Sequence, residues 1–329
     1  VPAFGSNGRQ GKGRLLVAEA DESDGSLVKF QASLAVLTNL ELDHTDHYPN
    51  LEALIATVQR FTGRCKTLLA NGDCSVLRSH FKADHWWSIR NPEQADFAAL
   101  ARDSRGDGTT AEFFENGRQV GSLAIPLPGV HNLSNVTAAV AACRLEGISF
   151  VELQQAVAAL KAPGRRFDYR GTWQGRLVVD DYAHHPSEVN ATLSMARLML
   201  ETGTSPLPQQ PTRLLAVFQP HRYTRTAEFL DGFAAALSQA DAVVLAPLYS
   251  AGEQPIKGIS SEALATAIRQ HNPHLSVAVA TSNESLAGVV DDCSSPGDLV
   301  LAMGAGDING LWDRLNSLSQ DGAMPLLAA

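Results

Sequence analysis

The densest group of reactive side chains follows residues 177–181, an apolar run that ends in two aspartates. Two carboxylates, one phenol and two imidazoles come close together there, as Asp180, Asp181, Tyr182, His184 and His185. Packing in a hydrophobic core does not explain this polarity, because burying unpaired polar groups is costly. The segment therefore indicates a ligand site at the end of a strand.

A second polar segment, residues 219–226, also follows an apolar run and precedes a helical pattern. It contains His221, Arg222 and Arg225, and the two arginines are spaced about one helical turn apart. A helix N-terminus attracts anions through its exposed backbone N–H groups. We expect an anion site here, where the guanidinium groups stay charged and orient a ligand without abstracting protons.

Two oxygen-rich segments also follow apolar runs. Residues 15–18 lead into the acidic segment 19–24, and residues 34–37 lead into segment 39–47. Both apolar runs are expected to be buried strands that open into polar loops. Crowded carboxylates repel one another unless a cation compensates, so a divalent ion that bridges phosphates is one interpretation. A solvated acidic turn is the other.

Amide and guanidinium groups offer further contacts for a ligand. Asn132 and Asn135 stand at an alanine-rich helical pattern over residues 132–147, where they could cap the helix or hydrogen-bond a purine edge. Arg165 and Arg166 could bind phosphate or ribose, or could be surface charge. Both pairs remain open between a structural and a functional role.

Zinc and dinucleotide sites are two alternatives that the spacing disfavours. The spacing of the nearest candidate ligands matches no standard zinc set, the residues being Cys65, Cys74, His80 and His85. Residues 304–310 contain a GxGxxxG pattern, but the dinucleotide fingerprint opens a βαβ unit with an acidic residue about twenty positions later. We expect residues 304–310 to form a tight strand-to-helix turn.

These segments must be positioned by two α/β domains, because 329 residues exceed the usual size of one core. We place the boundary at Pro163-Gly164, which gives domains at 1–162 and 163–329. The first domain is expected to contain a helix over residues 50–61, a strand-like region over 66–128 and helices over 132–147 and 151–160.

In the second domain, apolar runs alternate with helical patterns. Strands are expected over residues 177–181, 214–219, 242–246 and 299–303, and helices from Ser187 and over 229–237. This alternation predicts a doubly wound, mainly parallel sheet. The polar loops after its strands should then face one cleft.

Composition and charge exclude several classes of protein. The 26 basic and 35 acidic residues give a net charge of -9, which disfavours nucleic-acid binding. No apolar run reaches the roughly 18 residues that cross a bilayer. The four cysteines form no CxxC pair and are expected to be reduced in a cytoplasm. The polar, glycine-rich first residues lack an initiator Met, so we expect the true start to lie upstream.

Taken in order, these segments resemble the Mur ligase family over nearly the whole chain. The resemblance rests on the acidic segment 19–24, residues 39–46, HNLSN at 131–135, GRRF at 164–167, DDYAHHP at 180–186 and residues 219–226. DDYAHHP followed by FQPHRYTRT is similar to the members that add L-alanine, whereas the tripeptide-recycling members share only the first segment well.

The resemblance implies a cytoplasmic enzyme with a UDP-binding domain, a central ATPase domain and a carboxyl-terminal Rossmann-like domain, of which the first is not in this chain. It further implies ATP-dependent ligation of L-alanine to UDP-N-acetylmuramate through an acyl phosphate, with Mg²⁺, in peptidoglycan precursor biosynthesis. Ligation of a recycled tripeptide and nucleotide binding without catalysis are the alternatives.

Carried over motif by motif, the resemblance implies roles for individual residues. Glu19 and His44 would bind Mg²⁺, and the nucleotide contacts would be Asn132 and Asn135 at the adenine and Arg166 and Asp181 at the ribose side. The residues facing the reacting carboxylate and L-alanine would be His184, Arg222 and Arg225, supported by Tyr182 and His221. No residue is identified as the general base.

Two features of the family pattern are absent from the sequence. It contains no GxxxxGK[ST] phosphate loop, and residues 45–64 contain no lysine that could be carbamylated. The family places the phosphate loop before the region that this chain covers, so we expect it upstream of Val1, and we expect the chain alone to have no turnover.

Overall fold

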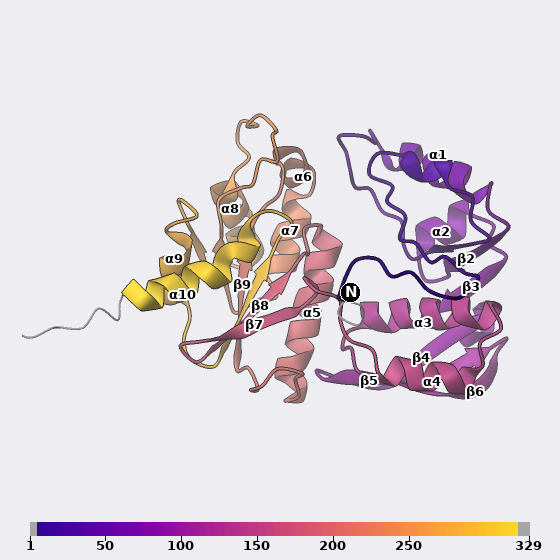
Figure 1. Cartoon of the computed structure of the whole chain (residues 1–329). Helices are drawn as coiled ribbons and strands as arrows, with labels where there is room; N and C mark the ends of the chain where they lie inside the picture. The colour runs from indigo at the N-terminus through magenta and orange to yellow at the C-terminus, as the bar shows by residue number, and fades with distance from the viewer. Residues whose placement is uncertain (1–4, 322–329) are drawn as a thin grey trace, which may run out of the picture. The chain divides into compact units, whose positions relative to one another are not determined.

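The computed structural model describes residues 5–321, and the chain divides into two compact units between Lys161 and Ala162. Each unit is a sheet covered by helices on both faces (Figure 1). None of the helices in the described part of the chain has the length and apolar character needed to span a membrane.

The first unit is built on a mixed sheet with the strand order β1-β2-β3-β4-β5-β6. β1 to β4 pair in parallel, and β4, β5 and β6 pair in antiparallel fashion. The strands are β1 (Leu34–Leu37), β2 (Thr67–Asn71), β3 (His85–Ser88), β4 (Phe97–Arg105), β5 (Gly108–Glu115) and β6 (Arg118–Ile125). The expectation of a strand-like region over residues 66–128 is confirmed, and the turn at Asn116-Gly117 joins β5 to β6.

Helices cover both faces of this sheet. α1 (Leu51–Thr62) and α2 (Ser75–His80) pack on one face, and α3 (Val130–Leu145) and α4 (Phe150–Ala158) pack on the other. α1 starts where the Asn50 side chain accepts the N–H of Ala53. Its buried side chains repeat at helical spacing, as the sequence predicts, and include Leu54, Ile55, Val58 and Phe61.

α3 begins two residues before the predicted start, and this changes the role of its amides. Gly129 precedes it with a φ of 96°, a conformation that favours glycine, and no side chain caps the helix. Asn132 and Asn135 therefore lie inside the first turns of α3, so the interpretation of either as its N-cap is wrong. The Asn132 amide donates to the carbonyl of Pro128 at 2.7 Å.

The prediction of a buried strand over residues 15–18 is also wrong. This segment has no strand conformation, and Leu16 and Val17 are 93% and 92% exposed. A strand needs a hydrogen-bonded neighbour, and within the described residues β1 is paired only with β2. The apolar pattern alone therefore does not place this segment in the sheet.

The second unit has the strand order β11-β10-β9-β12-β8-β7, in which every neighbouring pair is parallel except β7 with β8. The strands are β7 (Asp168–Trp173), β8 (Arg176–Asp181), β9 (Arg213–Phe218), β10 (Ala242–Leu245), β11 (Ser276–Val279) and β12 (Asp298–Met303). This confirms the predicted doubly wound, mainly parallel sheet. The sequence pattern does not predict β7.

Helices lie on both faces of the second sheet (Figure 1). α5 (Pro186–Thr202), α7 (Leu230–Leu237) and α8 (Ser261–His271) pack on one face, and α9 (Leu286–Cys293) and α10 (Leu311–Asp321) pack on the other. α6 (Tyr223–Glu228) is a short helix after β9. Single helical turns of the 3-10 type occur at Ser26–Lys29, Pro92–Gln94 and Ile308–Gly310.

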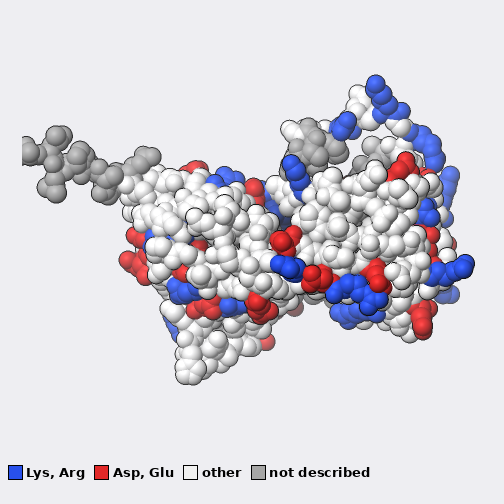
Figure 2. Space-filling view, turned by 90° about the horizontal axis from the view of Figure 1, so that it is seen from below, with Lys and Arg blue, Asp and Glu red and all other residues white. Residues whose placement is uncertain are grey.

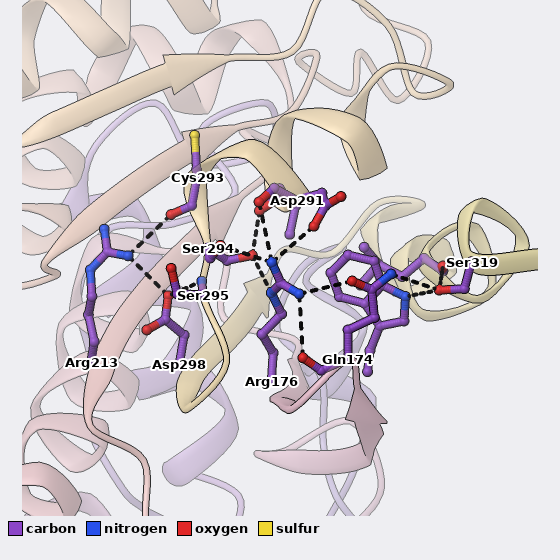
Figure 3. A network of polar contacts seen from close by, with 12 residues as sticks. Gln174, Arg176, Arg213, Asp291, Cys293, Ser294, Ser295, Asp298 and Ser319 are labelled. Atoms are coloured by element: carbon purple, nitrogen blue, oxygen red, sulfur yellow. Dashed lines mark hydrogen bonds and ion pairs between the residues drawn. The ribbon is translucent and has the colours of Figure 1, made fainter. Parts of the chain in front are cut away.

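A polar network closes the amino-terminal ends of the central strands (Figure 3). Arg176, at the start of β8, is 7% exposed in its side chain and donates to Ser294 and Asp291 at 2.9 Å. Arg213, at the start of β9, donates to the buried Asp298 of β12 at 3.0 Å. These groups satisfy one another, so this end of the sheet is structural.

Candidate functional site

The carboxyl-terminal ends of β8, β9 and β12 are joined directly by backbone hydrogen bonds. Gly304 N–H donates to the Asp181 carbonyl at 3.1 Å, and Gln219 N–H donates to the Met303 carbonyl at 3.0 Å. The segments that leave these strands therefore start side by side at one edge of the sheet. This is the edge at which doubly wound sheets bind ligands.

Asp181 organises the loop that follows β8. The residue is 4% exposed, and its carboxylate accepts the N–H groups of Phe167 and Ala183, both at 2.8 Å, and the hydroxyl of Thr192 at 3.3 Å. Burial raises its pKa, and these two backbone hydrogen bonds oppose that rise. Its predicted contact with ribose stays a prediction, since the carboxylate is engaged in holding the loop.

His184 is fixed by its own segment. Its Nδ1 lies 3.0 Å from the Tyr182 carbonyl and 3.2 Å from Oε2 of Glu188, and its ring meets the Tyr182 ring edge-on at 5.1 Å. Because both neighbours of Nδ1 are acceptors, Nδ1 carries the proton. The other ring nitrogen is then the basic atom of the neutral ring.

His221 links the two predicted ligand segments. Its ring centroid lies 6.1 Å from that of His184, and it stacks on Tyr249 at 5.4 Å with an interplanar angle of 10°. Its Nδ1 accepts from the Arg225 guanidinium at 3.2 Å. Burial, and then the nearby Arg225 charge, lower the pKa of His221 from 6.5 to about 4, so this imidazole is neutral at physiological pH.

The two arginines of this segment are held in different ways. Arg225 is 6% exposed and lies against His221, whereas Arg222 forms an ion pair with Glu253 at 3.6 Å. Arg222 has a φ of 67°, which is unusual for a residue with a side chain and places it in a strained turn before α6. The Glu253 carboxylate also accepts the N–H and hydroxyl of Thr224, at 3.0 and 2.7 Å.

Glu253 and Tyr249 were not among the predicted site residues, although the polar loop after β10 was expected to face the cleft. Tyr249 N–H donates to the Pro220 carbonyl at 2.9 Å, and Arg222 N–H donates to the Tyr249 carbonyl at 2.8 Å. A polar loop after a parallel strand is the signal that could have found both residues.

The predicted turn at residues 304–310 is confirmed, and close packing requires a glycine at position 306. A Cβ on Gly306 would lie 2.4 Å from Oε1 of Gln219 and 2.8 Å from the Tyr249 ring. Gln219 in turn donates to Asp307 at 2.6 Å and accepts from Ile308 N–H at 3.1 Å. The pattern therefore serves contact between the β9 and β12 loops.

Asp180 points to the opposite face of β8 from Asp181. It is 4% exposed, and among the described residues neither of its carboxylate oxygens has a hydrogen-bond partner. Burial raises its pKa, and the charge of Arg165 partly opposes that rise. Arg165 itself lies over the Tyr182 ring at 4.6 Å.

In the first unit, the structure brings Glu22 rather than Glu19 next to His44. Glu22 Oε1 lies 3.6 Å from His44 Nε2, while Glu19 is exposed in the segment that forms no strand. Across the described residues, no three His, Cys, Asp or Glu side chains form a group that could hold a metal ion. The magnesium ligands therefore stay a prediction, and His44 with Glu22 is the closer pair.

The predicted nucleotide contacts lie in both units. Asn135 is exposed and Asn132 partly buried on α3 of the first unit, and they are three positions apart on this helix. Arg166, in the second unit, is half-exposed and lies 3.7 Å from Oε1 of Glu188 and 5.7 Å from the Tyr182 ring. Both acidic and basic side chains occur on the face shown in Figure 2.

Comparison with known proteins identifies the protein family to which this chain belongs. The model of the Mur ligase middle domain matches residues 2–143, and that of the Mur ligase glutamate ligase domain matches residues 165–306. With its two α/β units and a polar site at the strand ends, the chain belongs to the Mur ligase family.

Two similar curated proteins carry the same name. UDP-N-acetylmuramate–L-alanine ligase of Synechococcus sp. (strain CC9311) is 62% identical over 98% of this chain and 66% of its own length. The protein of that name from Prochlorococcus marinus (strain MIT 9313) is 62% identical over 97% of this chain and 65% of its own. The chain thus spans about two thirds of the length of these relatives.

Solved structures show the same fold at lower identity. UDP-N-acetylmuramate-alanine ligase MurC from Thermotoga maritima superposes with a TM-score of 0.72 at 21% identity, over 92% of this chain and 63% of that one. A murein peptide ligase from Psychrobacter arcticus gives 0.60 at 21% identity, over 92% of this chain and 60% of that one.

Proposed function

We propose that this chain supplies the amino-acid site and part of the ATP site of an enzyme that ligates L-alanine to UDP-N-acetylmuramate in the cytoplasm. The observation that carries the proposal is the convergence of His184, His221, Arg222 and Arg225 at the strand ends of a chain 62% identical to ligases of that name. The relatives' length exceeds that of the chain, so the whole activity is assigned to the protein and not to this polypeptide alone.

The charges of the site suit a carboxylate substrate and an amino-acid nucleophile. Arg222 and Arg225 stay cationic at any working pH and can neutralise and orient the muramyl carboxylate and the carboxylate of L-alanine. Neutral His221 donates hydrogen bonds without adding charge, since its Nδ1 is occupied by Arg225. ATP would supply the phosphoryl group that activates the muramyl carboxylate as an acyl phosphate, and attack of the L-alanine amine on the acyl carbon would release that phosphate.

The structure supports some of the proposed nucleotide contacts better than others. Arg166 and the exposed Asn135 are accessible to a ligand, which fits the proposed contacts with ribose and adenine. Among the described residues His44 and Glu22 are a pair that could contribute to Mg²⁺ binding, but they do not form a metal site by themselves. The sequence also holds no GxxxxGK[ST] loop to bind the ATP phosphates.

The reading frame that encodes this chain, expressed from its own start codon, provides the test. Phosphate release should require ATP, Mg²⁺, UDP-N-acetylmuramate and L-alanine together, and the 329-residue polypeptide alone should release none. Ligation of free tripeptide in preference to L-alanine would replace the proposal with the recycling reaction. Turnover by the polypeptide alone would refute the expectation that it is inactive.

A further inference from the structure

Glu188 contacts both the proposed substrate side and the proposed nucleotide side of the second unit. It is the third residue of α5, and its Oε2 accepts the N–H groups of His184 and His185 at 3.0 and 3.3 Å. The same oxygen lies 3.2 Å from Nδ1 of His184, and Oε1 lies 3.7 Å from Nη1 of Arg166. One carboxylate therefore joins an imidazole and a guanidinium that the proposed function assigns to different ligands.

Helix capping alone does not require this arrangement. α4 in the first unit begins with a capping box in which Glu152 accepts from the N–H of Ser149 at 3.1 Å and from its hydroxyl at 2.5 Å. That cap satisfies the helix terminus through a serine. Glu188 satisfies the α5 terminus, and its Oε2 also lies 3.2 Å from Nδ1 of His184, beside the Tyr182 carbonyl at 3.0 Å.

We propose that Glu188 is a positioning residue of the ligation reaction, which holds the His184 ring and the Arg166 guanidinium in a fixed relation. The inference rests on the proposed function for the roles of these two partners. The Glu188 side chain is 34% exposed, so water screens both contacts and each is worth little by itself. Its effect comes from setting the geometry of two ligand contacts at once.

The charge of the Glu188 carboxylate should affect how readily the His184 ring is protonated. The ring of His184 lies beside Tyr182, Glu188 and His221. Arg166 lies 3.7 Å from Glu188, and Arg225, Arg222 and Glu253 lie near His221. Glu188 places a carboxylate oxygen 3.2 Å from Nδ1 of the ring, so its charge favours the imidazolium form. Removing its charge should make the ring harder to protonate.

Nuclear magnetic resonance of the histidine-labelled polypeptide tests this point without any activity. In Glu188→Gln the titration midpoint of the His184 ring should fall by about half a pH unit to one unit. Glu188→Asp, which keeps the charge, should restore most of the shift, and the matched cap variant Glu152→Gln should leave the midpoint unchanged. An unchanged midpoint in Glu188→Gln would overturn the proposal.

The active enzyme provides the second arm. Glu188→Gln should raise KM for ATP about threefold through Arg166 and move the acidic limb of the kcat profile to lower pH, whereas Glu152→Gln should change neither. If the Glu188→Gln enzyme has lower thermal stability but an unchanged KM and pH profile, Glu188 acts only as a cap of α5 and the proposal is wrong. If the wild-type enzyme does not ligate L-alanine, the proposed function fails, and the magnetic resonance result still decides whether Glu188 positions His184.

Discussion

Asp181→Asn and Asp180→Asn form a matched pair that separates hydrogen bonding by a buried carboxylate from its charge. Both aspartates end β8, and both are 4% exposed. Asp181 accepts two backbone N–H groups, from Phe167 and Ala183, at 2.8 Å. Neither oxygen of Asp180 has a hydrogen-bond partner among the described residues. The same change at adjacent positions should therefore have different effects.

Asp181→Asn leaves one oxygen for two backbone donors and turns the new amide group toward an N–H. Losing a charge-assisted hydrogen bond and leaving a buried donor unsatisfied costs about 2–3 kcal/mol, and relief of the buried charge offsets about 1 kcal/mol. For a unit of this size, 1 kcal/mol shifts Tm by roughly 2–4 °C. We expect Asp181→Asn to lower the Tm of the second unit by roughly 2–8 °C, and Asp180→Asn to leave it unchanged or raise it.

The pH dependence has a defined sign. Burial raises the pKa of Asp180 above 3.8, so the folded state keeps this proton to higher pH than the unfolded state does. The stability that this group contributes is thus present below pH 3.8 and is lost as the pH rises through the folded-state pKa. Any gain from Asp180→Asn should be present at neutral pH and disappear below pH 3.8.

Differential scanning calorimetry measures both variants, and the transition of the first unit is the internal control. Hydrogen exchange should show loss of protection at the Phe167 and Ala183 amides in Asp181→Asn only. Equal shifts in Tm for the two variants, or a rise in Tm with Asp181→Asn, would refute the assignment of Asp181 as the residue that holds the loop.

Three further outcomes can be measured on the same polypeptide. Arg176→Met should lower the free energy of unfolding, measured in urea, by about 2 kcal/mol, because the partners of this 7% exposed side chain lose their hydrogen bonds. A change near zero would contradict this. Gly171→Ala should destabilise the second unit more than Gly203→Ala does, since its Cβ would lie 2.3 Å from the Trp312 ring while Gly203 has open space. The pKa of His221 is lowered from 6.5 to about 4, so stability should fall as pH drops between these values, and His221→Phe should flatten that part of the curve in urea titrations.

The strands and helices that bury a continuous apolar face could be predicted from the sequence. β8, β9 and β12 are buried on both faces of the sheet, and their sequences are mostly apolar runs. The polar residues that follow these runs indicate where the candidate site lies. Residues 15–18 show the same kind of run but lie exposed, because a run does not specify the neighbour with which a strand pairs.

Side chains that join the site from a distance were harder to predict. Glu253 reaches Arg222 and Thr224 from the loop after β10, a contact that no spacing along the chain encodes. Glu188 carries a local signal, three positions after the N-cap of α5, but the N-cap is His185 and not one of the usual capping residues. Both acidic residues were therefore absent from the predicted site.

Arg222 and Arg225, the two arginines proposed to face the substrates, are held by different contacts. Arg225 is 6% exposed and donates to Nδ1 of the neutral His221. Arg222 is paired with Glu253, which offsets part of its charge and holds it in a strained turn. We therefore expect an anionic ligand at these residues to meet an Arg222 guanidinium that Glu253 holds in direction and an Arg225 guanidinium that is buried against a neutral ring. Two guanidinium groups held in this way would suit the proposed site, which must orient two carboxylates.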